Sequence, residues 1–255
     1  MGATTFIGII PARYASTRFP GKPLAELGGC TVIERVYRRV ASVLGENVAV
    51  ATDDDRIRLA VEAFGGKAVM TSAEHRSGTD RCLEAYRNLG SKADVVINIQ
   101  GDEPFIAPEQ IRAVMECFGT PSTRIATLAR PFAKERTYDE LENPNTPKVT
   151  IGRDGNALLF SRSVIPYIRS GERTGWPAAT QYYTHIGLYA YRADTLAEIT
   201  TLPQSPLELA ESLEQLRWLG NGYRIKVALN DSPTIGIDTP ADLEAARKYL
   251  ESHAI

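Results

Sequence analysis

FIGIIPARYASTRFPGKPL, residues 6–24, begins with a short apolar run and continues into a loop that carries three cations. The run Phe6–Ile10 has the length and branched side chains of a strand that is buried on both faces. Arg13, Arg18 and Lys22 then fall within ten residues, and the prolines and glycine among them keep a helix from starting before residue 25. Open α/β sheets bind ligands in loops at the carboxyl ends of their strands, and the positive charge of this loop predicts an anion.

Two interpretations of the loop stay open. Arginine and lysine side chains in loops are mostly just solvated. Here, however, Ser16, Thr17 and the backbone at Gly21 add donors that can converge with the cations on one polyphosphate. The sequence contains no Gly-Lys-Ser/Thr ending and no Gly-x-Gly-x-x-Gly after the strand, which excludes the P-loop and the dinucleotide fingerprint. We favour a phosphate site of another kind.

The composition is that of an ordinary globular protein. Of 255 residues, 43% are hydrophobic and 24% are charged, and this length suffices for one large α/β core. A formal net charge of -2 offers no basic surface to nucleic acid, and no apolar run approaches the roughly 20 residues of a membrane helix. We therefore expect a cytoplasmic protein without nucleic-acid binding or membrane insertion. Cys30, Cys82 and Cys117 lack metal-ligand spacing, so we expect free thiols.

From residue 6 to about residue 130 the pattern alternates strand and helix. Val32, Val36 and Val40 recur on one helical face, and Gly65-Gly66 ends the following helix. The order βαβαβαβ predicts a mostly parallel sheet with right-handed crossovers, which is the α/β class. We expect strands at Phe6–Ile10, Asn47–Thr52, Lys67–Met70, Val95–Gln100 and Ile125–Ala129, and helices at Thr31–Leu44, Arg56–Phe64, Asp80–Leu89 and Pro108–Cys117.

After residue 130 the alternation weakens. Residues 161–182 show no periodicity and predict an irregular arm that covers the site or meets a partner subunit. Because no linker divides two free domains, we expect one domain over residues 1–255, with residues 143–190 as a substrate-side and possible dimerisation insertion. The remaining expected elements are strands at Val149–Ile151, Ala157–Phe160 and Tyr183–Tyr191, and helices at Pro206–Gly220 and Pro240–Tyr249.

Two aspartates are candidate metal ligands. Asp102 follows the buried strand that ends at Gln100, which puts it at the ligand-binding edge near the cationic loop. A turn or capping aspartate before Pro108 is the alternative, and the nearby cations favour the metal. Asp238 follows a short apolar segment and precedes Pro240, where the spacing supports helix capping and metal binding about equally.

Two other polar stretches adjoin predicted helices. Asp53-Asp54-Asp55 looks like the DxD motif that holds a metal in sugar-nucleotide transferases, but carboxylates also cap helices, and capping is favoured. The loop from His75 to Arg81 enters a helix, and both a functional loop and a plain N-cap at Thr79 are open there.

Seven motifs carry a family resemblance. They are IIPARYASTRFPGKPL at residues 9–24, HRSGTDR at 75–81, QGDEP at 100–104, FSR at 160–162, HIGLY at 185–189, LEQLR at 213–217 and GIDTP at 236–240. In this order they resemble the 3-deoxy-manno-octulosonate cytidylyltransferases, and the match follows nearly the whole chain. Phe19 stands where that family commonly has leucine, and residues 165–182 match poorly.

The resemblance implies a Rossmann-like three-layer nucleotidyltransferase fold, a homodimer, Mg2+, and CTP and 3-deoxy-D-manno-octulosonate (Kdo) as substrates in lipopolysaccharide synthesis. It gives catalytic roles to Arg13, Arg18 and Lys22 at the CTP phosphates and to Asp102 and Asp238 as magnesium ligands. CTP binding would also involve Ala12, Ser77, Gly78 and Arg81, with cytosine recognised at residues 77–81. The Kdo contacts would be Gln100, Arg162, His185, Tyr189, Glu214 and Gln215.

Three alternatives remain. The first is a cytidylyltransferase for another sugar acid, such as amino-Kdo or sialic acid, although Tyr14-Ala15-Ser16-Thr17-Arg18 argues against the sialic-acid branch. The second is a glycosyltransferase that uses Asp53-Asp54-Asp55, which would leave Lys22 and Asp238 without a task. The third is a catalytically silent nucleotide-binding regulatory protein.

Overall fold

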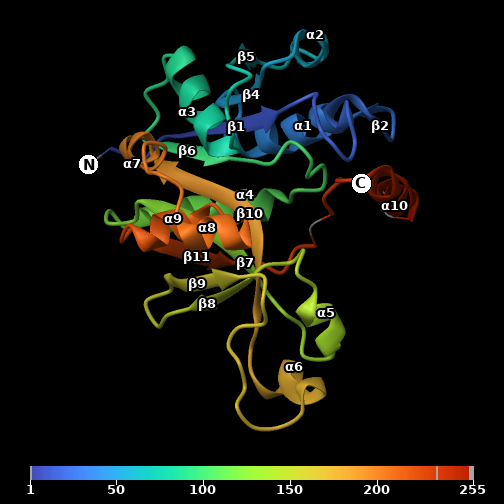
Figure 1. Cartoon of the computed structure of the whole chain (residues 1–255). Helices are drawn as coiled ribbons and strands as arrows, with labels where there is room; N and C mark the ends of the chain where they lie inside the picture. Colours follow the sequence, from blue (N-terminus) through green and yellow to red (C-terminus); the bar gives the residue numbers. More distant parts are fainter. Residues whose placement is uncertain (1, 234, 253–255) are drawn as a thin grey trace. The chain divides into compact units, whose positions relative to one another are not determined.

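The computed structural model describes residues 2–233 and 235–252, which belong to two compact units (Figure 1). Unit 1 combines Met1–Arg112 with Pro233–Ile255, and unit 2 is Ala113–Ser232. Cys30, Cys82 and Cys117 are free thiols, as predicted. None of the helices in the described part of the chain is long and apolar enough to cross a membrane. The prediction of one domain over the whole chain stays a prediction.

Unit 1 is built on parallel strands in the order β6-β1-β4-β5. Gly8 of β1 is aligned with Val48 of β4 on one side and with Ile97 of β6 on the other. Every residue of β4 and β6 is buried, as the apolar runs predicted. The strands are β1 (Phe6–Ala12), β4 (Val48–Thr52), β5 (Ala68–Met70) and β6 (Val95–Asn98).

The helices of this first half lie within two residues of their expected bounds. In α1, Thr31 is the N-cap, and its side chain accepts a hydrogen bond from the Glu34 backbone N–H. The same helix buries Val36 and Val40, which confirms the predicted apolar face. The helices are α1 (Val32–Leu44), α2 (Asp55–Ala63), α3 (Gly78–Asn88) and α4 (Pro108–Glu116), the last of which ends in unit 2.

The expectation that no helix starts before residue 25 was wrong. A short 3-10 helix, η1, spans Lys22–Leu24. Pro23 lies in its first turn, where the missing proline N–H would have had no helical partner anyway. Gly21 precedes it with φ +72°, a left-handed conformation that glycine adopts without steric cost.

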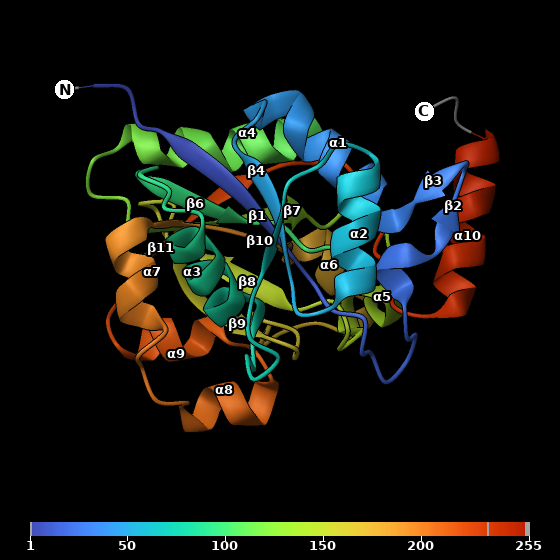
Figure 2. The same ribbon diagram turned by 90° about the horizontal axis from the view of Figure 1, so that it is seen from above.

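Residues 233–252 return the chain to unit 1. Helix α10 (Pro240–Ser252) lies beside the small hairpin of β2 (Glu26–Leu27) and β3 (Cys30–Thr31), which the sequence did not predict (Figure 2). Arg247 Nη2 donates to the Glu26 carbonyl over 3.0 Å. Leu243 of α10 belongs to the same buried apolar cluster as Leu27 of the hairpin. This packing fixes the segment that contains Asp238 within unit 1.

Unit 2 contains the other long strands. Strand β7 pairs in parallel with β11 and antiparallel with β10, and β8 pairs antiparallel with both β10 and β9. The arm at residues 161–182 is largely irregular, as expected, with only η3 (Arg173–Gly175) and α6 (Trp176–Ala179) in it. The other elements are η2 (Cys117–Gly119), β7 (Ile125–Pro131), α5 (Tyr138–Glu142), β8 (Lys148–Ile151), β9 (Ala157–Ser161), β10 (Tyr183–Arg192), α7 (Ala193–Ile199) and β11 (Ile225–Leu229).

The single helix expected at residues 206–220 is in fact two helices. Helix α8 spans Pro206–Glu211 and α9 spans Gln215–Gly220. Between them Ser212 has φ +50°, which ends α8 in a left-handed conformation. Arg162 holds this break, because its Nε donates to the Glu211 carbonyl over 2.6 Å and its Nη2 to the Ser212 carbonyl over 3.3 Å. Those carbonyls would otherwise accept from the next turn of a continuous helix.

Candidate functional site

A cavity of about 230 Å3 opens in unit 1, where the loops after β1 and β6 meet the start of α3. It lies at the carboxyl end of the parallel strands, as the sequence predicted. Of the residues assigned to CTP, the metal or Kdo, six line it: Arg13, Lys22, Gly78, Arg81, Gln100 and Asp102. Ala12 and Ser77 are next to lining residues but do not themselves line the cavity.

Lys22 joins the two candidate metal ligands. Its Nζ lies 2.6 Å from Asp102 Oδ2 and 3.2 Å from Asp238 Oδ1. The Lys22 side chain is only 12% exposed, so water screens these ion pairs less than it screens pairs on the surface. Arg18 Nη2 also reaches Asp238 Oδ1, at 3.1 Å, but both side chains are at least half exposed. The structure thus brings Arg18, Lys22, Asp102 and Asp238 together.

Neither aspartate serves as a helix cap. At the start of α10, Thr239 Oγ1 accepts from the Asp242 N–H, and Asp242 Oδ2 accepts from the Thr239 N–H over 2.8 Å. At the start of α4, Gln110 Oε1 accepts from the N–H of Ala107. Other residues therefore make the capping hydrogen bonds at these two helices, and metal binding by Asp102 and Asp238 stays a prediction.

Glu103, the neighbour of Asp102, has a raised pKa. Burial raises the pKa of Glu103 to about 7, and the adjacent Asp102 carboxylate adds to the shift. The Ile237 N–H donates to the Asp102 carbonyl over 2.9 Å, so the backbones of the two acidic loops are joined. The sequence did not single out Glu103, and only its burial distinguishes it.

Arg13 and Arg81 are cations held at the cavity. The Arg13 Nη2 atom is buried and has no hydrogen-bond partner within the described residues. Arg81 is fully buried, with Nη1 donating to Thr71 Oγ1 over 2.6 Å and Nη2 3.2 Å from Asp53 Oδ2. Burial lowers the pKa of Arg81, and the Asp53 carboxylate opposes that shift. A buried donor without an acceptor, as at Arg13, is costly unless a ligand satisfies it.

The start of α3 is capped by Ser77, not by Thr79 as one prediction had it. Ser77 Oγ accepts from the Asp80 N–H over 3.1 Å. Thr79 is instead buried inside the first turn. A side chain at Gly78 would meet Pro11 Cγ at 3.3 Å, so the first turn of α3 approaches β1 closely. Backbone N–H groups of this turn therefore lie at the cavity.

The three consecutive aspartates each face an arginine. Asp53 pairs with Arg81, Asp54 with Arg56 and Asp55 with Arg58. Asp54 is also the N-cap of α2, which confirms the favoured capping interpretation. Because their charges are already balanced, nothing in their surroundings favours a DxD metal site.

In unit 2, His185 and Tyr189 lie together on β10. The His185 ring is 5.0 Å from the Phe160 ring and 5.3 Å from the Tyr189 ring, and its Nε2 is 3.0 Å from Thr127 Oγ1. Burial lowers the pKa of His185 to about 3, so its imidazole is neutral near pH 7. Tyr189 packs edge-on against Trp218. The neutral imidazole and the buried phenol can bind a polar ligand but add no charge.

Glu214 and Gln215 follow the break between α8 and α9. Glu214 Oε1 accepts from Arg217 Nη2 over 2.7 Å. Gln215 is 4% exposed, and its Nε2 has no hydrogen-bond partner within the part of the chain that the structure describes. As with Arg13, a buried donor without an acceptor points to a ligand or a water molecule.

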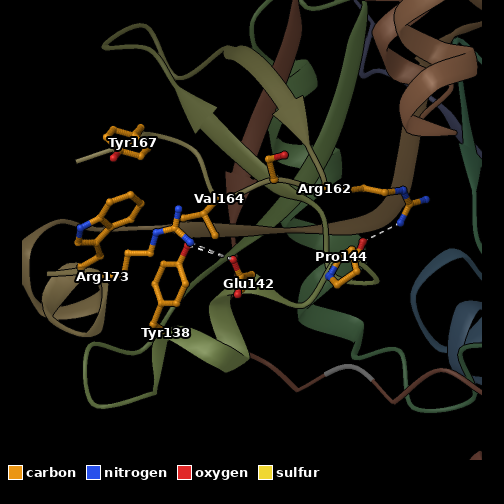
Figure 3. A pocket seen from close by; sticks show the side chains of 9 residues that line it. Tyr138, Glu142, Pro144, Arg162, Val164, Tyr167 and Arg173 are labelled. Atoms are coloured by element: carbon orange, nitrogen blue, oxygen red, sulfur yellow. Dashed lines mark hydrogen bonds and ion pairs between the residues drawn. The ribbon is translucent and has the colours of Figure 1, made fainter. Parts of the chain in front are cut away.

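The Arg162 guanidinium donates to backbone carbonyls, and its predicted contact with Kdo stays a prediction. Besides its bonds to Glu211 and Ser212, its Nη1 donates to the Pro144 carbonyl over 2.8 Å (Figure 3). Lys148, which the sequence did not single out, supports the same segment, since its Nζ donates to the carbonyls of residues 143 and 146. Burial lowers the pKa of Lys148 to about 8. Arg162 therefore connects the segment around residue 144 with residues 211–212.

The arm forms a second cavity, of about 480 Å3 (Figure 3). Trp176 packs edge-on against Tyr138 and Tyr167, and Arg173 lies over the Tyr138 ring. Arg173 also faces Glu142 at 3.8 Å. These contacts give the irregular segment a defined aromatic core, which its sequence did not reveal.

Comparisons with known proteins agree with the sequence motifs. A family profile described as cytidylyltransferase matches residues 7–225. The chain is 61% identical to the 3-deoxy-manno-octulosonate cytidylyltransferase of Bacteroides thetaiotaomicron, over 98% of this chain and 99% of that one. It is 63% identical to that of Phocaeicola vulgatus, over 96% and 97%.

A solved structure supports the same assignment. CMP:2-keto-3-deoxy-manno-octonic acid synthetase complexed with CTP superimposes with a TM-score of 0.89 at 42% identity, over 98% of this chain and 99% of that one. This agreement confirms the α/β nucleotidyltransferase fold with a mostly parallel sheet. The chain belongs to the 3-deoxy-manno-octulosonate cytidylyltransferase family.

Proposed function

We propose that the chain transfers CMP from CTP to the anomeric hydroxyl of Kdo, giving CMP-Kdo and pyrophosphate for lipopolysaccharide synthesis. The anomeric oxygen forms a bond to the α-phosphorus, the bond from that phosphorus to pyrophosphate breaks, and the hydroxyl proton is released. Such a transfer needs positioning and charge neutralisation more than a nucleophilic side chain. The observation that carries the proposal is the convergence of Arg13, Lys22 and Asp102 on one cavity.

The cations of the loop would bind the triphosphate. A phosphate oxygen would satisfy the buried Nη2 donor of Arg13. Lys22 lies on the same cavity, and Arg18 would add charge from a more exposed position. Cytosine would be read by Ser77, Gly78 and Arg81 at the start of α3, with Ala12 beside them.

Asp102 and Asp238 would hold Mg2+. Their carboxylates fit a hard cation, because both already reach one ammonium group, that of Lys22. The described residues contain no group of three histidine, cysteine or acidic side chains that could bind a metal ion without help. Phosphate oxygens and water would therefore complete the coordination, as is usual for Mg2+. The ion would neutralise charge on the transferring phosphate.

The sugar acid would be bound by Gln100, His185, Tyr189, Glu214 and Gln215. Kdo presents hydroxyl groups that require both donors and acceptors. The unpartnered Nε2 of Gln215 can donate, and the Glu214 carboxylate can accept. Arg162 would contribute by holding residues 211–212 just before these two side chains.

We also propose a cytoplasmic homodimer. The insertion at residues 143–190 would serve the substrate side, since it contains both Arg162 and His185, and the possible dimer contact. Light scattering after size-exclusion chromatography gives the subunit number directly, and a monomer at assay concentrations would contradict the dimer.

Pyrophosphate release tests the reaction. The protein is incubated with CTP and Mg2+ and with Kdo, amino-Kdo or N-acetylneuraminate. We expect the highest kcat/KM with Kdo. A higher value with another sugar acid would reassign the substrate. No release with any of the three would overturn the enzymatic function and leave the silent nucleotide-binding protein.

A further inference from the structure

Within the stretch Asp53-Asp54-Asp55, the Asp54 carboxylate has no assigned role in the proposed reaction, yet it is connected through Arg56 to the loop at residues 13–22. Asp54 accepts from Arg56 Nε over 2.9 Å and from Arg56 Nη2 over 2.6 Å. It also accepts from the Arg56 backbone N–H at the start of α2. A two-point bond of this kind fixes the plane of the guanidinium as well as its position.

The fixed guanidinium lies on an aromatic ring of the loop. Arg56 Cζ is 3.3 Å from the centroid of the Tyr14 ring, well inside the range of a cation–π contact. The Arg56 side chain is 58% exposed and contacts the Asp54 carboxylate and this ring. The contact joins α2 to the loop.

Tyr14 in turn sets the end of the loop. The Gly21 N–H donates to the Tyr14 carbonyl over 2.9 Å. A side chain at Gly21 would meet Tyr14 ring atoms at 3.1–3.2 Å, so the ring packs directly against this backbone. The next residue is Lys22, whose ammonium bridges Asp102 and Asp238. A continuous set of contacts therefore runs from Asp54 through Arg56 and Tyr14 to Lys22.

We propose that Arg56, held by Asp54, is a positioning residue that fixes the loop through the Tyr14 ring and so places Lys22 for the phosphates of CTP. Arg56 itself does not line the cavity. The inference rests on the proposed function for its effect on CTP, but the ordering of the loop is independent of any activity. Arg56 thereby acts on substrate binding from outside the site.

The test compares Arg56→Met with Arg58→Met. Arg58 lies on the same helix, where its side chain pairs with Asp55 and Glu62. We expect Arg56→Met to raise the KM for CTP about fivefold, as for loss of one cation–π contact, with the KM for Kdo unchanged. Arg58→Met should leave both constants unchanged. Equal changes of the KM for CTP in the two variants would overturn the proposal.

A double-mutant cycle separates positioning from general stability. Tyr14→Ala alone should raise the KM for CTP, and Arg56→Met should add nothing further in that background, because both changes break one contact. Tyr14→Phe keeps the ring and should retain the coupling. Additive effects of Arg56→Met and Tyr14→Ala would contradict the proposal.

Hydrogen exchange tests the loop without a substrate. We expect the amides of residues 14–24 to exchange faster in Arg56→Met than in wild type, and to be unchanged in Arg58→Met. If the wild type released no pyrophosphate, the proposed reaction would fail while this readout still decided the role of Arg56. Unchanged exchange in Arg56→Met would overturn the positioning role.

Discussion

Lys22 Nζ lies 2.6 Å from Asp102 Oδ2 and occupies the point at which the two candidate magnesium ligands converge. The Lys22 ammonium and the Arg18 guanidinium together balance the charges of the two carboxylates. If Asp102 and Asp238 hold Mg2+ as proposed, Lys22 would then be available to the phosphates of CTP. The same side chain would thus serve both the free and the substrate-bound site.

Asp102→Asn and Asp238→Asn should each lower kcat by at least about 100-fold, because the amide cannot replace the charge that holds the cation. Pyrophosphate release at saturating CTP and Kdo measures the effect. Asp55→Asn, which changes an exposed partner of Arg58, is the matched control and should remain fully active. Wild-type turnover in either of the first two variants would return that aspartate to a structural role.

Lys22→Met should raise the KM for CTP by about tenfold or more, as expected for loss of a hydrogen bond from a charged donor. The KM for Kdo should change less. Lys92→Met, at an exposed lysine of unit 1, controls for the loss of one positive charge. A larger increase in the KM for Kdo than in the KM for CTP would contradict the assignment of the loop to the phosphates.

Removal of divalent metal by EDTA should stop pyrophosphate release, and added Mg2+ should restore it. The melting temperature without CTP should hardly change, because Lys22 and Arg18 already pair with Asp102 and Asp238. Differential scanning calorimetry with and without EDTA measures this. A large drop in melting temperature would mean that a metal ion supports the free fold.

His185 should make the fold sensitive to acid. Its pKa is lowered to about 3 in the folded chain against 6.5 when unfolded, so the unfolded chain binds more protons between these values. Stability is therefore lost as pH falls from about 6.5 towards 3. Between pH 8 and pH 5 the wild type should lose about 5 °C more in melting temperature than His185→Gln. Parallel losses in both proteins would show that His185 is not buried in its neutral form.

Arg162→Met should raise the KM for Kdo several-fold and leave the KM for CTP unchanged, because the change frees the break before Glu214 and Gln215. Arg169→Met, an exposed arginine of the same arm, is the control and should bind Kdo normally. If Arg162→Met raised the KM for CTP as much as the KM for Kdo, the residue would have a general structural role instead.

The strands and helices of the first half were predictable because their signals are local. The apolar runs and the valines of α1 lie within single elements, and their bounds differ from the structure by two residues at most. The break at Ser212 was not predictable in this way. It depends on Arg162, which lies 50 residues earlier in the chain. Sequence spacing within residues 206–220 contains no trace of that contact.

In the candidate site too, some residues were predictable from the sequence and others were not. Residue types and loop position predicted the cations and Asp102, because the cationic loop and the loop with Asp102 each follow a strand of one parallel sheet. Spacing left Asp238 between helix capping and metal binding. The structure shows Thr239 and Asp242 making the capping bonds of α10, and metal binding by Asp238 stays a prediction. Ser77 and Thr79 are both good caps by type, and only the bond to the Asp80 N–H distinguishes them.

The return of α10 to the hairpin has a consequence for biosynthesis. Asp238 is translated 216 residues after Lys22, although the two side chains form one ion pair. During synthesis the sheet of unit 1 can assemble early. Until the segment with Asp238 is made, however, Asp102 is the one of these two aspartates that can pair with the Lys22 ammonium. The ion pair between Lys22 and Asp238 can therefore form only after the sheet strands of unit 1 have been synthesised.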